Sequence, residues 1–164
     1  MKKLTNLLRP FGIVGLIALV VIQFVPVELN RGGYESVLAF EQETNVSPEL
    51  SKLFKANCYD CHSNQTQYPW YSSMAPINFW LSEHVVDGKK HFNVSQWSEY
   101  SIKRKDHKLE ELIEEVEEQE MPLPSYTWVH GNLTDAERLS LIQWAQMVRL
   151  SYVVEDTSAP VEAN

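Results

Sequence analysis

Two cysteines and a histidine stand at a spacing that could hold an iron porphyrin. Cys58 and Cys61 are the only cysteines of the chain, and His62 directly follows the second one. Thiols three residues apart lie on one side of a helical turn, so each can reach one vinyl group of the same porphyrin. The adjacent histidine is then held beneath the iron as an axial ligand. The spacing predicts one c-type haem, attached covalently through Cys58 and Cys61 and ligated by His62.

The Cys-x-x-Cys-His segment is also compatible with a zinc site, a redox-active dithiol or a chance occurrence of the pattern. A zinc site would need a fourth ligand, and usually a second pair of cysteines or histidines. A dithiol of the thioredoxin kind expects a βαβ context, which the sequence lacks. Export of the chain would weaken the case for a chance occurrence, because c-type haem is attached outside the bacterial cytoplasm.

An electron-carrying haem needs a second axial ligand. Among the candidates, Met121 has the most suitable sequence context. This residue follows a helical pattern and precedes Pro122 and Pro124, in a loop ahead of the C-terminal helix. The prolines restrict the loop, which lowers the entropic cost of presenting a weak sulfur ligand. A methionine ligand also raises the reduction potential of haem iron. A hydrophobic helix end is the other interpretation of Met121.

The remaining methionines and histidines are less suited to ligation. Met74 lies only 12 residues after His62, which makes the opposite face of the haem difficult to reach. Met147 lies within the C-terminal helix and is predicted to be a core residue. His84 lies on the same apolar helix face as Trp80 and Leu81. A core residue is its main interpretation, and a ligand of the iron or a contact of a haem propionate are the alternatives. Polar surroundings predict surface positions for His91, His107 and His130.

Aromatic residues gather directly after the cysteine motif. Large aromatic side chains make good walls for a haem pocket, although ordinary core packing would use them equally well. Trp70, Tyr71 and Trp80 are the residues that we expect to line the pocket.

The elements that must position these residues are predicted to be helices. Ser47 and Pro48 form a helix start, and Thr134 with Glu137 forms a capping box. The predicted helices cover residues 48–60, residues 77–88, a stretch around 103–120 and a stretch from 134 onward. No alternating strand pattern of useful length is present. The prediction is an all-α, cytochrome c-like domain of about four helices around one haem over residues 47–152, followed by a disordered tail at 153–164.

An apolar run before this domain predicts an N-terminal membrane anchor over residues 1–27. Residues 11–27 would span about 26 Å as a helix, close to the roughly 30 Å of a bilayer core. Lys2, Lys3 and Arg9 would stay in the cytoplasm, which predicts a single-pass protein of the bacterial inner membrane with its domain in the periplasm. A cleaved signal and a buried core helix are the alternatives. Residues 28–46 are expected to be a flexible linker.

Charge excludes one class of function. The chain has 164 residues, with 14 basic and 22 acidic ones, so a nucleic-acid partner is excluded. The basic residues Lys103, Arg104, Lys105 and Lys108 precede seven glutamates between positions 110 and 120. A solvated face is the main interpretation. The alternatives are acids that steer a basic redox partner and bases that neutralise haem propionates.

The chain resembles the bacterial "haem-binding domain" family of small proteins with a single c-type haem. The resemblance covers roughly residues 47–150 and includes the Cys58–Asn64 segment, Thr66, Pro69-Trp70-Tyr71, Ala75-Pro76, Trp80, Phe92–Ser95, Trp97, Met121-Pro122 and Tyr126. It implies haem attachment at Cys58 and Cys61 and iron ligation by His62. It implies no reaction, since the family is defined by its haem site.

The sequence therefore predicts a membrane-tethered periplasmic cytochrome that transfers single electrons with His62 and Met121 as axial ligands. We expect an electron carrier and not an enzyme, since a peroxidase would need distal acid–base groups or a second haem motif. A haem-based sensor or small-ligand binder with an open sixth position is the alternative. The expected partners are the membrane, redox proteins, among which the acidic surface favours basic ones, and the machinery that matures c-type cytochromes.

Overall fold

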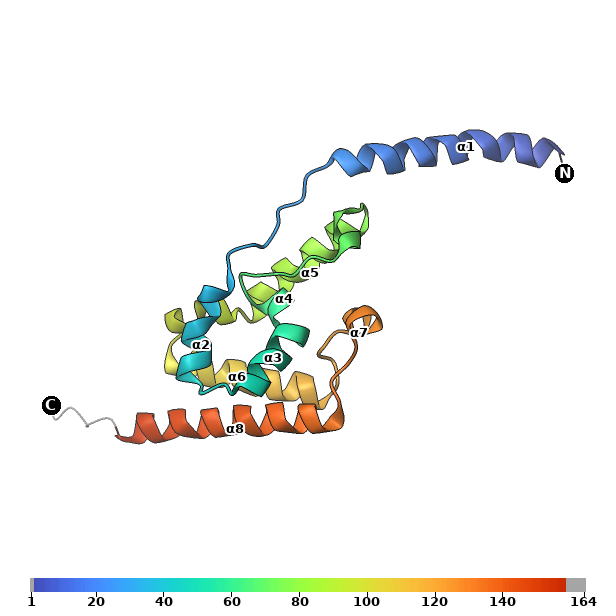
Figure 1. The fold of residues 1–164 in the computed structure, drawn as a ribbon. Helices are drawn as coiled ribbons and strands as arrows, with labels where there is room; N and C mark the ends of the chain where they lie inside the picture. The colour runs from blue at the N-terminus through green and yellow to red at the C-terminus, as the bar shows by residue number, and fades with distance from the viewer. Residues whose placement is uncertain (1, 159–164) are drawn as a thin grey trace.

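The computed structural model describes residues 2–158, with side chains described from residue 10 to residue 153. The described chain is helical, as predicted, with short 3-10 turns between the α-helices (Figure 1). The α-helices are α1 (Lys2–Val21), α2 (Leu38–Glu43), α3 (Pro48–Asn57), α4 (Tyr59–His62), α5 (Ile77–His91), α6 (Ile102–Glu117), α7 (Pro124–His130) and α8 (Asp135–Ser158). The 3-10 turns are Ile22–Phe24, Tyr34–Val37, Trp70–Ser73 and Val94–Glu99.

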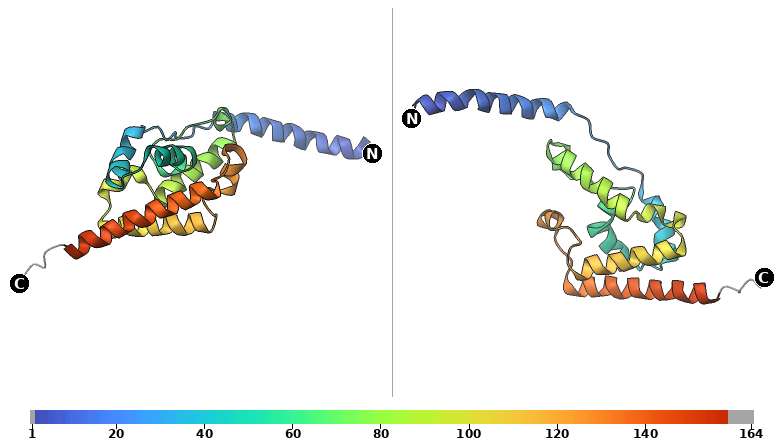
Figure 2. Two further views of the ribbon diagram at one scale, coloured as in Figure 1. Left: turned by 60° about the horizontal axis from the view of Figure 1, so that its bottom comes forward. Right: turned by 180° about the vertical axis from the view of Figure 1, so that it is seen from behind.

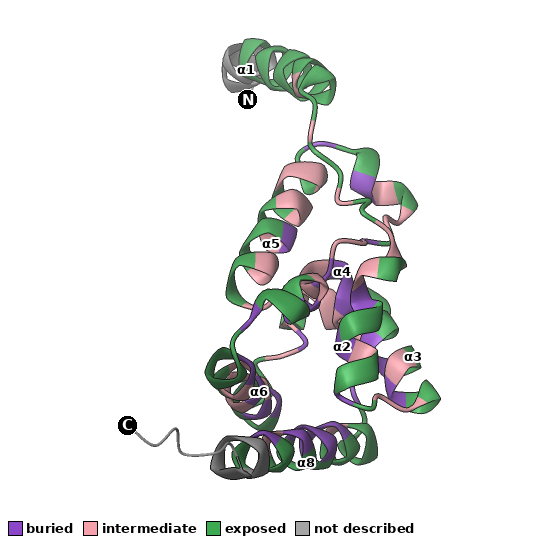
Figure 3. Cartoon of the chain, turned by 90° about the vertical axis from the view of Figure 1, so that its left-hand side faces the viewer, coloured by how far each residue is buried: buried purple, intermediate pink, exposed green. Residues whose placement is uncertain are grey.

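Helices α6 and α8 lie side by side and form one wall of the core (Figures 1 and 2). The buried residues of α8 lie along one face of the helix, on the side of the core (Figure 3). They include Leu141, Ile142, Trp144, Ala145 and Val148, which pack in one cluster with Leu109, Ile113 and Val116 of α6. Their spacing of three and four residues places them on one stripe of each helix, so burial of that stripe holds the pair together.

Local signals start the helices as expected. The Ser47 hydroxyl accepts a hydrogen bond from the Leu50 amide at 3.2 Å, which caps α3. Ahead of α8, the Thr134 amide donates to Glu137 at 2.8 Å and the Glu137 amide donates to the Thr134 hydroxyl at 3.3 Å. The predicted capping box is confirmed.

The number of helices around the site was predicted too low. The stretch expected to be one helix over residues 48–60 consists of α3 and α4, which are separated at Cys58 by a non-helical backbone (φ −127°, ψ −47°). Helix α7 lies in the segment that was expected to be a loop. Both are short, and elements of one or two turns show too few apolar positions for a period to be recognised.

Residues 28–46 are not a flexible linker. Val37 and Phe40 are buried, and the ring of Phe40 makes edge contacts with Trp97 and Trp144 at centroid distances of 5.0 and 5.8 Å. Next to it, the Glu43 carboxylate receives two hydrogen bonds, of 2.8 and 2.7 Å, from the ammonium group of the buried Lys105. The prediction was wrong because α2 contributes a single turn of core residues, which a polar sequence context conceals.

The prediction of an N-terminal transmembrane helix is also wrong. Helix α1 ends at Val21 and is followed by a 3-10 turn and an extended segment. Only residues 11–21 of the apolar run are therefore α-helical, about 16 Å, or roughly half of a bilayer core. Within residues 2–158, no helix is both long and apolar enough to span a bilayer. The single-pass location in the inner membrane that depended on this anchor is corrected with it.

The C-terminal boundary differs as well. Residues 153–164 were expected to be a disordered tail, but α8 continues to Ser158. The rest of the expected tail, residues 159–164, lies outside the described residues.

Candidate functional site

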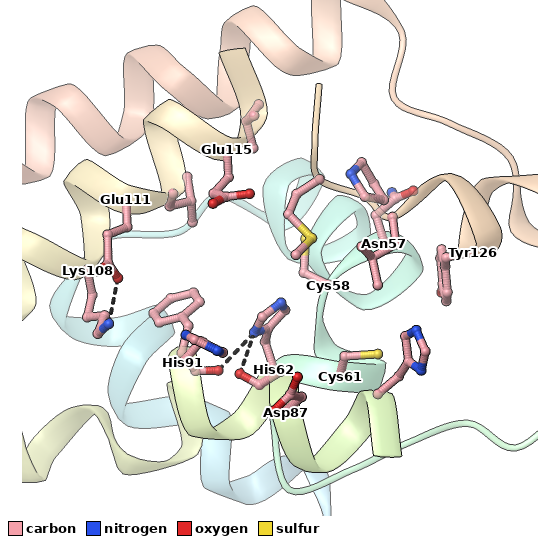
Figure 4. Close-up of a pocket in the computed structure, with 18 of the residues that line it drawn as sticks. Asn57, Cys58, Cys61, His62, Asp87, His91, Lys108, Glu111, Glu115 and Tyr126 are labelled. Carbon is pink, nitrogen blue, oxygen red and sulfur yellow. Dashed lines mark hydrogen bonds and ion pairs between the residues drawn. The ribbon is translucent and has the colours of Figure 1, made fainter. Parts of the chain in front are cut away.

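A cavity of about 880 Å³ lies between α4 and α5 on one side and α6 on the other (Figure 4). The loop after α6 and one residue each of α3, α7 and α8 (Asn57, Tyr126 and Leu141) complete its wall. Cys58, Cys61, His62 and Met121 all line this cavity. Its volume falls within the range of roughly 300–1,000 Å³ that is usual for cofactor sites. The structure thus brings the two thiols, the imidazole and the thioether of the sequence prediction to one hollow.

The short helix α4 divides its residues between the core and the cavity. The Cys58 amide donates to the Phe54 carbonyl at 2.8 Å, and the His62 amide donates to the Cys58 carbonyl at 2.9 Å, which keeps the turn closed. Tyr59 points into the core and stacks on Phe54 with a centroid distance of 5.5 Å. Tyr59 is thus buried in the core, whereas Cys58, Cys61 and His62 line the cavity.

Both cysteine side chains are protonated thiols at neutral pH. Burial raises the pKa of Cys58 and that of Cys61 to about 12, with a smaller contribution from the charge of Asp60. Zinc is bound by thiolates and needs four ligands. Among the residues that the structure describes, no group of three His, Cys, Asp or Glu side chains could hold a metal ion. A zinc site at the motif therefore has no support from the geometry.

The imidazole of His62 is held in one orientation by two backbone carbonyls. Its Nδ1 lies 3.0 Å from the Gly88 oxygen and 2.9 Å from the Phe92 oxygen. Both partners can only accept, so Nδ1 carries the proton and Nε2 keeps its lone pair. Burial lowers the pKa of His62 against the effect of these hydrogen bonds, which favours the neutral ring. A neutral imidazole with a fixed Nδ1–H is the form in which histidine binds a metal through Nε2.

Gly88 allows this arrangement because it has no side chain. A Cβ at position 88 would lie 2.8 Å from the carbonyl oxygen of Cys61 and 3.0 Å from its Cβ, closer than packed atoms approach. The glycine was expected to end its helix, but α5 continues to His91. Its role is the close contact between α5 and α4, and no local sequence signal distinguishes that role from a helix end.

Polar residues that carry the family resemblance form a network around the motif. The Asn64 amide donates to the Ser95 hydroxyl at 2.8 Å, and the side chain of the buried Asn93 donates to that of Asn64 at 3.3 Å. The hydroxyl of Thr66 donates to the Asp60 carbonyl at 2.5 Å. The two bonds of Asn64 tie the loop after the motif to the segment that begins at Phe92, which supplies one carbonyl to His62. The network therefore fixes the second support of the imidazole.

Of the three methionines that the structure describes, Met121 lies at the cavity. Its amide donates to the Glu115 carbonyl at 3.1 Å, which holds the loop against the end of α6. Met74 and Met147 are exposed, and neither lines the cavity. The expectation that Met147 is a core residue is wrong, because it lies between Ala145 and Val148 but off the buried stripe of α8.

The aromatic walls differ in part from the prediction. Trp80 lines the cavity as expected, whereas Trp70 and Tyr71 do not, and Trp70 is 79% exposed. Phe92 and Tyr126 were not predicted as wall residues, although both line the cavity and both belong to the resemblance. They were missed because the prediction of wall residues considered only aromatic residues close to the motif in sequence, and both lie far from it along the chain.

Besides His62, two histidines line the cavity and two lie outside its lining. His84 lines the cavity, and its Nδ1 lies 2.8 Å from the Trp80 carbonyl oxygen. His91 was expected at the surface, and it is exposed but also lines the cavity. His107 and His130 are exposed, as expected, and lie outside the lining.

Charged side chains of α5 and α6 face the same cavity. The acidic lining residues are Glu83, Asp87, Glu111, Glu114 and Glu115, and Lys108 is the basic one. Lys108 donates to Glu111 at 2.5 Å. The glutamate side of α6 is therefore not only a solvated face, since its middle turn borders the cavity.

Asp60 joins the motif to the far wall. Its carboxylate accepts from the Gln67 amide at 2.7 Å and from the Tyr126 hydroxyl at 3.1 Å. Burial raises the pKa of Asp60 despite these bonds. The pKa of Tyr126 is raised by its burial and by the nearby carboxyl group, so this residue remains a neutral phenol at the cavity wall.

The chain belongs to the haem-binding domain family, which it matches over residues 17–147. This match confirms the resemblance and supports haem as the ligand of the protein. Neither the curated proteins nor the solved structures contain a match to the chain. The likeness to the fold of cytochrome c therefore stays a prediction. The cavity fits a haem in its volume, its largely apolar walls and its paired thiols beside an oriented imidazole.

Proposed function

We propose that this protein is a single-haem c-type cytochrome that transfers single electrons. The observation that supports the proposal is the common cavity of Cys58, Cys61, His62 and Met121. Haem supplies an iron that gains and loses one electron between its ferric and ferrous forms. The protein contributes attachment, axial ligands and a largely apolar surrounding.

Cys58 and Cys61 are proposed to hold the haem by two thioether bonds. Each thiol would add across one vinyl double bond, so that sulfur bonds to one vinyl carbon and the thiol hydrogen moves to the other. The reaction consumes no oxidant, and it needs both sulfurs as free thiols. The structure has both cysteines free and protonated, which suits this addition.

His62 and Met121 are proposed to be the axial ligands. The carbonyls of Gly88 and Phe92 hold the His62 ring with Nε2 available, so little reorientation is required for ligation. Met121 is presented by a loop that its amide hydrogen bond to α6 restrains. Histidine with methionine gives a six-coordinate iron without an open position, which suits an electron carrier better than a sensor or an enzyme.

The acidic character of the chain is proposed to select its redox partner. The whole chain has a formal net charge of −8, and five carboxylates face the cavity. Opposite charge increases the rate at which proteins meet and aligns them during the encounter. A basic electron-transfer protein is the partner that this charge favours.

Absorption spectra of the haem-loaded protein test the proposal. We expect a low-spin, six-coordinate spectrum that carbon monoxide leaves unchanged, and a near-infrared sulfur-to-iron band in the ferric form. Met121→Ala should lose this band and have a lower reduction potential. Met74→Ala is the matched control, because Met74 is exposed and lies outside the cavity lining. A five-coordinate iron that readily binds carbon monoxide in the unmodified protein would instead support the sensor alternative and reject the proposal.

A further inference from the structure

We propose that Lys108 anchors a propionate group of the haem. This inference rests on the proposed function, because it takes the haem to be attached at Cys58 and Cys61. Among the described residues that line the cavity, Lys108 is the only lysine or arginine. Its side chain is only 14% exposed.

The position of the cysteines determines where the propionates must lie. A haem carries its two vinyl groups towards one edge and its two propionates towards the opposite edge. Cys58 and Cys61 lie on one side of His62, and Lys108 and His91 lie on the other (Figure 4). With the vinyl edge bound to the cysteines and the iron at His62, the propionate edge is directed towards Lys108.

Charge makes Lys108 the residue that can compensate a propionate at this edge. The other charged side chains of the lining are five carboxylates, which would repel a second carboxylate. In the structure the ammonium group of Lys108 pairs with Glu111, one helical turn further on. A lysine ammonium has three donors, so it can keep this partner and bind a propionate as well.

Glu111 then acts as a positioning residue for Lys108. It holds the ammonium group at the cavity and, as a negative charge, weakens the effect of Lys108 on a propionate. The other titratable side chains at the cavity from the facing helix α5 are Glu83, His84, Asp87 and His91. Removal of the positive charge of Lys108 should make the propionate a weaker acid. Removal of the negative charge of Glu111 should make it a stronger one.

Titration of the propionates in the full haem-loaded chain tests this proposal. Haem made from a carbon-13-labelled precursor gives each propionate carboxyl carbon its own NMR signal. We expect one propionate of the unmodified protein to be the stronger acid, and Lys108→Gln to lower its acid constant about tenfold. Glu111→Gln should raise the same constant. Lys103→Gln, which removes an equal charge from an exposed position of α6, should change neither propionate.

The outcomes separate this inference from the proposed function. Identical propionate titrations in the unmodified, Lys108→Gln and Glu111→Gln proteins would overturn the role of Lys108 and leave haem attachment intact. A purified chain without covalently bound haem would overturn both. If Lys108→Gln fails to fold, an unchanged acid constant in Glu111→Gln would still overturn the role of Lys108, because the two side chains pair at the cavity.

Discussion

Gly88 of α5 approaches Cys61 of α4 so closely that an added Cβ would lie 2.8 Å from the Cys61 carbonyl oxygen. The same glycine gives its own carbonyl to Nδ1 of His62 at 3.0 Å. One backbone position therefore sets the spacing of the two helices and the orientation of the imidazole. Any side chain at position 88 must displace the element that carries the cysteines.

Gly88→Ala is accordingly expected to destabilise the protein. Overpacking of this kind typically costs about 1–3 kcal/mol, which should exceed the gain in helix propensity of up to about 1 kcal/mol. The free energy of unfolding, measured with urea, checks the expectation. Gly15→Ala in α1 is the control, since nothing lies within 4 Å of its added Cβ and no loss of stability should follow. Equal effects of the two substitutions would contradict the close contact.

The ion pair between Lys105 and Glu43 should contribute to stability. Lys105 is buried on α6, whereas the Glu43 side chain is 34% exposed. We expect Lys105→Met to cost about 2 kcal/mol, less than the roughly 3–5 kcal/mol lost when one partner of a fully buried pair is removed. Lys103→Met at an exposed position of the same helix is the control in urea unfolding. A loss no larger than that of the control would contradict a stabilising role of the ion pair.

The pH dependence of the same pair has a definite sign. Burial of Glu43 opposes its ionisation, but hydrogen bonds from Lys105 and Tyr152 hold its pKa below the ordinary 4.5. Its stabilisation is therefore present above pH 4.5 and is lost as the pH falls through the lowered folded pKa. Unfolding experiments between pH 6 and pH 3 should show this acid loss in the unmodified protein and a smaller one in Glu43→Gln. Parallel curves would contradict the account.

His62 predicts a second pH effect, in the haem-free chain. Burial lowers its folded pKa below the ordinary 6.5, so below this pH the unfolded state binds a proton that the folded state does not. Stability should then fall with decreasing pH, by at most about 1.4 kcal/mol per pH unit, until the folded pKa is reached. The difference between unmodified and His62→Gln chains isolates the effect. A difference that does not vary with pH between 7 and 5 would oppose a buried, neutral imidazole.

The parts of the site that were predictable from sequence are local ones. Cys58, Cys61 and His62 share one helical turn, so their spacing alone indicates their relation. The position of Met121 at the cavity could be expected from the helix end before it and the two prolines after it. The apolar residues of α8, spaced three and four apart, likewise indicate from the sequence which side of that helix is buried.

The remaining parts depend on contacts between distant segments. The carbonyl of Phe92 that orients His62 belongs to the backbone, and its position depends on the bonds of Asn64 with the 93–95 segment. Phe40 reaches the core from a helix of six residues, too short for a periodic signal. The apolar run at 11–27 indicated a membrane helix because composition alone does not show that the helix ends at Val21.

Covalent attachment of the haem is the claim on which ligation, electron transfer and the role of Lys108 all depend. The most direct measurement is the intact mass of the chain, purified from a host that matures c-type cytochromes and treated with a thiol-alkylating reagent under denaturing conditions. We predict the mass of the chain plus one haem, with neither Cys58 nor Cys61 alkylated. A colourless protein with both cysteines alkylated and no added haem mass would contradict the account.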